Sequence, residues 1–342
     1  MPPGARTRLA EMPAYPAAVF AVVLLAAVIA TDVARRTFPA LQRSEQLVVQ
    51  AGRPSDGDYY LANDIGGHID HHVILYGIDA VVNARLRAAE VLFLGNSRLM
   101  FAMRSNELRP WFAAEGVPYY VMGFGFREAD RFPLAIIRKF DLRPRLVVVN
   151  ADGFFGGGLS EWAEAAVRDT PFAARKLQIE AEAAHRARDV VHQVVPNWLG
   201  LHGLPGLALE RRFIVHRSRQ DGTWDISTWP EGTQAFGQPP LEGPELGRGE
   251  VAAARAFKAE LDARGSRLVL TRVPTPEPMP GGGPARFAEL LDVPLVMADA
   301  PALTTYDQSH LSQGSAHDWS GAFLRALAPY VRALRAPGAD AR

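Results

Sequence analysis

The sequence predicts an α/β protein in which helices cover both faces of a parallel β-sheet. Short apolar segments alternate with longer segments of helical periodicity from about residue 89 to residue 335. One of the short segments, residues 145–149, is almost continuous in Leu and Val, as a fully buried strand is. The chain has 342 residues and about half of them are apolar, so it is long enough to bury a large core.

The first element in the chain is a long apolar segment near the N-terminus. Residues 12–31 carry no charge, and residues 17–30 are almost purely Ala, Val, Leu, Ile and Phe. A helix of about 20 such residues spans the hydrocarbon core of a membrane. The segment therefore predicts a transmembrane anchor, with a cleaved signal peptide and a buried helix as the alternatives. Arginines flank it on both sides, so charge does not set its orientation.

The chain divides into an anchor, a lead-in and one domain. Residues 1–36 are expected to be a tail and the anchor, and residues 37–88 a partly helical stalk. Residues 89–335 are expected to form the domain, with an insertion at about 154–249 where the alternation breaks down. Residues 336–342 are expected to be a tail.

Strands and helices are expected to alternate along the domain. The expected strands are residues 91–94, 118–122, 145–149, 267–273 and 294–298. The expected helices are residues 105–115, 127–140, 160–195, 250–264, 285–291 and 316–334. Ser105 is a candidate N-cap for the first of these helices. Since ligands bind at the carboxyl ends of parallel strands, polar residues that directly follow a strand are candidates for function.

Composition excludes several classes of protein. The 37 Lys and Arg residues balance 37 Asp and Glu residues, so the chain lacks the basic excess of a nucleic-acid binder. It has no cysteine, which excludes disulfides, thiolate metal sites and cysteine nucleophiles. No segment indicates a dinucleotide, metal or haem cofactor, and we expect none.

Two short segments carry candidate catalytic residues. Gly95 ends the first strand of the domain, and Ser97 follows near the start of a helix, where backbone N–H groups stabilise a developing anion. Asp307 and His310 follow the last expected strand, at a spacing that lets the carboxylate reach the imidazole. Each segment alone also fits a helix cap, but together they predict a Ser-His-Asp triad.

This arrangement resembles the SGNH, or GDSL, hydrolase superfamily. The chain has Gly-Asn-Ser-Arg at residues 95–98 where the more usual block of the family is Gly-Asp-Ser-Leu. It resembles the variant block of membrane-anchored members, a group similar to the alginate-acetylation proteins. The resemblance covers about residues 88–335 apart from the insertion. It implies a flavodoxin-like three-layer α/β/α sandwich. It also implies that Ser97 is the nucleophile, with His310 and Asp307 as its acid–base partners.

The resemblance further implies an oxyanion hole formed by three segments. The expected backbone donors are Ser97 and either Gly123 or Gly125. Family members supply a third donor from the asparagine of a Gly-x-Asn-Asp block, whereas this chain places Asp152 there and Asn150 two residues earlier. A carboxylate facing an oxyanion is repulsive, so a protein that keeps the fold without turnover is one alternative.

The function implied is hydrolysis or transfer of O-acyl groups, chiefly acetyl, on a cell-envelope glycan or exopolysaccharide. The expected location is the inner membrane, with a single span and the catalytic domain on the periplasmic side. A multi-pass membrane acyltransferase is the expected partner. The alternatives are a lipase or thioesterase on small acyl substrates and a non-catalytic assembly protein.

A dense cluster of His68, Asp70, His71 and His72 lies in the lead-in. Histidines at close spacing bind zinc in other proteins. Here adjacent His71 and His72 would point to opposite sides of a strand, and flanking glycines indicate a loop. A structural role is the preferred interpretation, ahead of lining the active-site mouth, contacting a partner or binding a metal.

Overall fold

The computed structural model describes residues 58–64, 67–125, 128–189, 215–226, 234–236, 245–276, 283–300 and 302–335. The expected anchor and the C-terminal tail lie outside these residues. Nearly all of the described chain belongs to one compact unit, Pro54–Ala187 with Glu210–Arg342. Within the described ranges, no helix has the length and apolar character needed to cross a membrane.

Four parallel strands form the central sheet in the order β4-β3-β5-β9. They are β3 (Val91–Gly95), β4 (Tyr119–Gly123), β5 (Leu146–Asn150) and β9 (Arg267–Thr271). The strand expected at residues 294–298 is reduced to one parallel bridge between Leu295 and Leu270, next to Pro294, which has no N–H to donate. If these four strands and the Leu295 segment are numbered from 1 to 5 along the chain, their order across the sheet is 2-1-3-4-5, as in a flavodoxin-like sheet.

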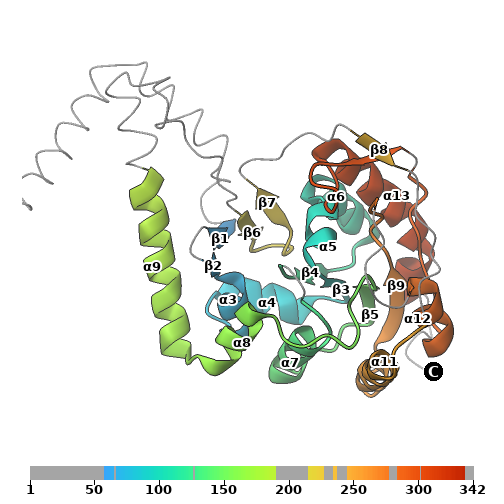
Figure 1. Cartoon of the computed structure of the whole chain (residues 1–342), viewed down its shortest axis with the longest axis horizontal. Coiled ribbons are helices and arrows are strands. Elements are labelled where there is room, and N and C mark those ends of the chain that lie inside the picture. The colour runs from blue at the N-terminus through green and yellow to red at the C-terminus, as the bar shows by residue number, and fades with distance from the viewer. Residues whose placement is uncertain are drawn as a thin grey trace, which may run out of the picture. The chain divides into compact units, whose positions relative to one another are not determined.

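Helices cover both faces of this sheet (Figure 1). One face carries α5 (Ser97–Ala102), α6 (Ser105–Glu115) and α13 (Gln313–Arg332). The other carries α4 (Ala80–Ala88), α7 (Arg131–Phe140) and α11 (Arg248–Asp262). Helix α12 (Pro284–Leu291) packs near β9, and a short 3₁₀ turn, η2 (Ala333–Arg335), ends the described chain. Trp319 of α13 is fully buried and stacks on Phe323, so apolar side chains fill the layer between helices and sheet.

The segment expected to be a stalk contributes to the compact unit from residue 59 onward. Strand β1 (Tyr59–Asp64) pairs with β2 (Gly67–His68) and with β6 (Val215–Ser218), which pairs with β7 (Trp224–Ile226). Helix α3 (Asp70–Tyr76) follows, and its apolar residues are buried in the core. The folded unit therefore begins earlier than the periodicity of the sequence indicated.

In the stretch expected to be one helix, residues 160–195, the described part up to residue 189 holds two helices. They are α8 (Glu161–Arg168) and α9 (Pro171–Asp189). Pro171 separates them, because proline lacks an N–H and disfavours helical backbone at the residue before it. Ser160 caps α8 by accepting the Ala163 N–H at 3.1 Å. Farther along, β8 (Gln234–Phe236) pairs with β10 (Leu303–Thr305) next to the last helix.

The outer edge of β4 is covered by the turn that follows β6. The Val121 N–H donates to the Asp221 carbonyl at 2.8 Å. Arg217 donates to the carbonyls of Val121 and Gly123 at 2.7 and 2.8 Å. Ser105, expected as an N-cap, is instead the first residue of α6 and donates to the Asp221 carboxylate.

Candidate functional site

Ser97, His310 and Asp307 form a chain of hydrogen bonds beyond the carboxyl end of β3. Ser97 is the first residue of α5, and the preceding Asn96 caps this helix by accepting the Arg98 N–H at 3.1 Å. Ser97 Oγ lies 2.8 Å from His310 Nε2, and His310 Nδ1 lies 2.7 Å from Asp307 Oδ2. The structure thus brings together the three residues that the two short segments predicted.

The loop between β10 and α13 sets the orientation of the imidazole. Asp307 Oδ1 accepts the backbone N–H groups of Ser309 and His310 at 3.0 and 2.7 Å. Partial burial raises the pKa of Asp307, but the hydrogen bonds from His310 and these backbone groups outweigh it and lower the pKa below its usual value. An ionised carboxylate therefore holds the His310 Nδ1–H, which leaves Nε2 free to accept the Ser97 proton.

Aromatic residues pack against the His310 ring. The Phe101 ring centroid lies 4.4 Å from it, and Tyr306 stacks on it at 5.7 Å with an interplanar angle of 17°. The His310 side chain keeps 18% of its surface exposed. The ring is thus held in place and remains reachable from solvent. Nothing in the sequence pattern distinguished Phe101 or Tyr306 from ordinary core residues.

Asn150, one candidate oxyanion donor, ties together the loops at the ends of three strands. It is fully buried at the end of β5, and its Nδ2 donates to Asn96 Oδ1 at 3.3 Å. Its Oδ1 accepts the Val273 N–H at 3.0 Å. Asn96 Nδ2 in turn donates to the Asp152 carbonyl at 3.0 Å. These amides hold the turn before Ser97 in place.

Asp152 is paired with an arginine that the sequence analysis did not single out. Its Oδ2 lies 2.5 Å from Arg98 Nη1, and the two side chains are 3% and 10% exposed. Arg98 Nε also donates to Ser309 Oγ at 3.1 Å. Burial raises the pKa of Asp152, and the neighbouring Arg98 opposes this shift. The repulsion expected from a carboxylate here is thus offset by a guanidinium that also reaches the His310 loop.

The glycines after β4 lie beside the turn that carries Ser97, because Gly123 pairs in register with Gly95. A Cβ on Gly123 would stand 2.5 Å from Met100 Sδ, so a larger residue here would displace the Met100 side chain of α5. The Gly123 carbonyl faces Arg217, and the N–H of a strand residue points to the same edge as its carbonyl. The Gly123 N–H therefore points away from β3, and Gly125, the other expected backbone donor, is buried two positions on.

His71 and His72 of the lead-in lie on helix α3, not on a loop or strand as expected, whereas His68 ends strand β2. His72 Nε2 binds Asp169 at 2.8 Å, and His71 binds Asp70 and Glu128. The described part of the chain contains no group of three His, Cys, Asp or Glu side chains arranged to hold a metal ion.

Comparisons with known proteins find only distant similarity. No protein-family model matches the chain, and no curated protein matches its sequence. It is similar to a structure described as a "putative acylhydrolase" from Bacteroides fragilis, with 13% identity and a TM-score of 0.33 over 73% of this chain and 93% of that chain. It is also similar to a GDSL-like lipase from Bacteroides thetaiotaomicron, with 13% identity and a TM-score of 0.34 over 75% and 98%. The functional assignment therefore rests on the geometry of Ser97, His310 and Asp307.

Proposed function

We propose that the protein cleaves acyl esters through Ser97, His310 and Asp307. The observation that carries the proposal is the 2.8 Å separation of Ser97 Oγ and His310 Nε2, with Asp307 holding the far side of the ring. A nucleophile within hydrogen-bond reach of a base that a third group orients is the arrangement required for covalent acyl transfer.

The mechanism has two stages. Ser97 Oγ attacks the ester carbonyl carbon while its proton passes to His310 Nε2, and the Asp307 carboxylate stabilises the imidazolium. The tetrahedral intermediate collapses, His310 protonates the departing alcohol oxygen, and an acyl-Ser97 ester remains. A water molecule or a sugar hydroxyl then attacks this ester, again with His310 as base. Water releases a carboxylic acid, whereas a sugar hydroxyl accepts the acyl group as a new ester.

The substrates that we propose are the O-acetyl groups of a cell-envelope glycan or exopolysaccharide. The variant block at residues 95–98 and the apolar segment at residues 17–30 support this proposal. In this setting the chain is anchored in the inner membrane, its domain faces the periplasm, and a multi-pass membrane acyltransferase supplies acyl groups. A non-catalytic assembly role is the alternative, supported by Asp152 at the position of an expected asparagine.

Covalent labelling tests the proposed nucleophile. The full chain in detergent is treated with a fluorophosphonate probe, and the modified peptide is identified by mass spectrometry. We expect labelling at Ser97, about 10²- to 10⁴-fold slower in His310→Ala because the base is lost. His317→Ala is the matched control, since His317 lies half-buried on α13 against Glu107 and is expected to leave labelling unchanged. A folded parent that is not labelled at Ser97 would refute the proposal.

Arg98→Lys is expected to lower kcat/KM for p-nitrophenyl acetate about 10- to 100-fold, because small displacements of catalytic groups are costly. The forked guanidinium binds Asp152 and Ser309 together, whereas an ammonium group is a point charge. Arg143→Lys is the control, because the Arg143 fork binds Asp141 on the exposed surface. Equal kinetics for the two variants would show that the Arg98 fork does not act on the site.

A further inference from the structure

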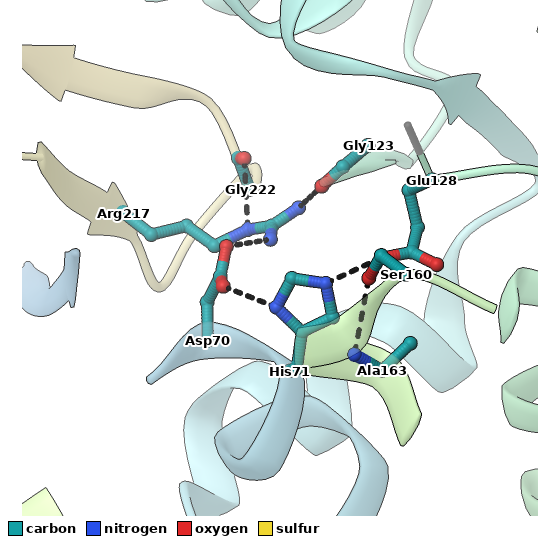
Figure 2. Close-up of polar contacts among 8 residues, drawn as sticks. All are labelled: Asp70, His71, Gly123, Glu128, Ser160, Ala163, Arg217 and Gly222. Atoms are coloured by element: carbon teal, nitrogen blue, oxygen red, sulfur yellow. Dashed lines mark hydrogen bonds and ion pairs between the residues drawn. The ribbon is translucent and has the colours of Figure 1, made fainter. Parts of the chain in front are cut away.

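Four charged residues are buried together beside the loop that follows β4 (Figure 2). We call them the ion cluster: Asp70, His71, Glu128 and Arg217. Each side chain is at most 1% exposed. None of the four takes part in the mechanism proposed above, and they come from α3, from β6 and from the loop itself.

The ion cluster is a continuous chain of hydrogen bonds. Arg217 Nη1 donates to Asp70 Oδ2 at 3.1 Å. His71 Nδ1 lies 3.1 Å from Asp70 Oδ1, and His71 Nε2 lies 2.7 Å from Glu128 Oε2. Glu128 also accepts the Ser160 hydroxyl at 2.6 Å, which joins the chain to the start of α8.

His71 completes the charge balance of the ion cluster. Burial lowers the pKa of His71, but hydrogen bonds to Asp70 and Glu128 outweigh it and raise the pKa from 6.5 to about 9. At neutral pH both ring nitrogens therefore donate protons, and two cations offset two anions. Charges this deeply buried persist only when they are paired in this way.

The ion cluster contacts the chain after β4 at Gly123 and Phe124, and Glu128 is itself one of its members. Arg217 Nη2 binds the Gly123 carbonyl at 2.8 Å, and Glu128 stands at the far end of the loop. Between them, the Phe124 ring packs 4.8 Å from the His71 ring and 5.2 Å from the Arg217 guanidinium. Gly125, one of the two candidate backbone donors of the site, follows Phe124 directly.

We propose that the ion cluster positions residues 123–125 so that a glycine amide there donates to the oxyanion that forms at Ser97. This inference rests on the proposed function. His71 is a positioning residue, because it touches no reacting atom and acts through Glu128 and Phe124. Buried ion groups add little net stability compared with apolar packing, whereas charge-assisted hydrogen bonds fix geometry closely. The ion cluster is thus suited to holding a loop in one arrangement.

His71→Gln tests this role, with His72→Gln as the matched control. Both histidines lie on α3 and are buried, and each binds a carboxylate, but His72 binds Asp169, away from the loop. In His71→Gln we expect kcat for p-nitrophenyl acetate to fall about 10- to 100-fold, less than the about 10²- to 10³-fold cost of removing an oxyanion donor, because the donor is displaced and not lost. We expect an unchanged KM, and faster amide hydrogen exchange in peptides covering residues 121–130. Neither kcat nor the exchange is expected to change in His72→Gln.

The pH profile gives a second readout. The groups that face His71 and its partner Arg217 are Asp70, Glu128, Tyr60 and Tyr120. Burial raises the pKa of both tyrosines above its usual value, so His71 is the group of this set that titrates near pH 9. A histidine with a raised pKa stabilises the folded loop fully below about 6.5, and this contribution is lost as pH rises through about 9. The kcat of the parent is therefore expected to fall above about pH 9. The His71→Gln variant is expected not to show this alkaline decrease in kcat.

The outcomes separate the two proposals. Equal kcat losses in His71→Gln and His72→Gln, or unchanged exchange at residues 121–130 in His71→Gln, would overturn the positioning role. If His71→Gln does not fold, the isosteric Glu128→Gln variant replaces it with the same expected results. If the parent shows no turnover and no labelling of Ser97, the proposed function fails, and with it the catalytic role of the loop. The exchange comparison then still decides whether the ion cluster holds the loop.

Discussion

Ser97→Ala is expected to lower kcat/KM for p-nitrophenyl acetate by at least about 10³-fold, because the variant lacks the group that forms the acyl-enzyme. His310→Ala is expected to fall in the same range. The double variant is expected to be no slower than either single variant, since nucleophile and base act as one unit. Initial rates of the purified full chain, followed by p-nitrophenolate absorbance, measure all three.

Ser105→Ala is the control for this loss. Ser105 begins α6 as Ser97 begins α5, but its hydroxyl donates to Asp221 and takes no part in the site. It is expected to retain the parental rate. A Ser97→Ala variant that works within tenfold of the parent would show that the hydrolysis does not depend on a covalent Ser97 intermediate.

Arg217→Met is expected to reduce the free energy of unfolding by about 3–5 kcal/mol, the range observed when one partner of a buried ion pair is removed. The Asp70 carboxylate would then lack its guanidinium partner in a fully buried site. The carbonyls of Val121 and Gly123 would lose a donor. Denaturant titration of the full chain, followed by tryptophan fluorescence, measures the loss.

Arg219→Met is the control for Arg217→Met. Arg219 follows β6 and pairs with Asp79 at 2.6 Å, but the two side chains are 20% and 12% exposed. Pairs that solvent reaches contribute about 1 kcal/mol or less, so a smaller loss is expected. Asp70→Asn combined with Arg217→Met should recover part of the stability, because it removes the excess negative charge left in the ion cluster. Similar losses for Arg217→Met and Arg219→Met would contradict the importance assigned to burial.

The central layers of the fold could be predicted because their signals are local. Buried strands such as β3 and β5 appear as short apolar runs, and the helix expected at residues 105–115 has the bounds of α6. The mixed α/β architecture with a parallel sheet is confirmed. The expected fifth strand is a single bridge, because an apolar run does not reveal how many ladder hydrogen bonds it will form.

The arrangement around this centre depends on pairings between distant residues. Strand β1 pairs with β6, which lies about 150 positions later in the chain, so neither segment showed its partner locally. The interruption between α8 and α9 did have a local signal in Pro171, which the helical composition of the stretch obscured.

The residues of the candidate site also fall into those with a local sequence signal and those whose partners lie far away in the chain. Ser97, Asp307 and His310 lie in short segments whose spacing could be recognised, whereas the partners of Arg98 are distant in the chain, Asp152 at 54 positions and Ser309 at 211. His71 stood out as part of a dense histidine segment, but its partner Glu128 lies 57 positions away. Departures from a family pattern, such as Asp152, are useful signals because a compensating residue is to be expected nearby.

The covered edge of β4 has a consequence for solubility. An exposed strand edge presents unpaired N–H and C=O groups on which a strand of another molecule can add, and this is a common route to aggregation. Here Asp221 and Arg217 occupy those groups at Val121 and Gly123. The arginine that holds the loop beside the site thereby also closes this side of the sheet to intermolecular strand addition.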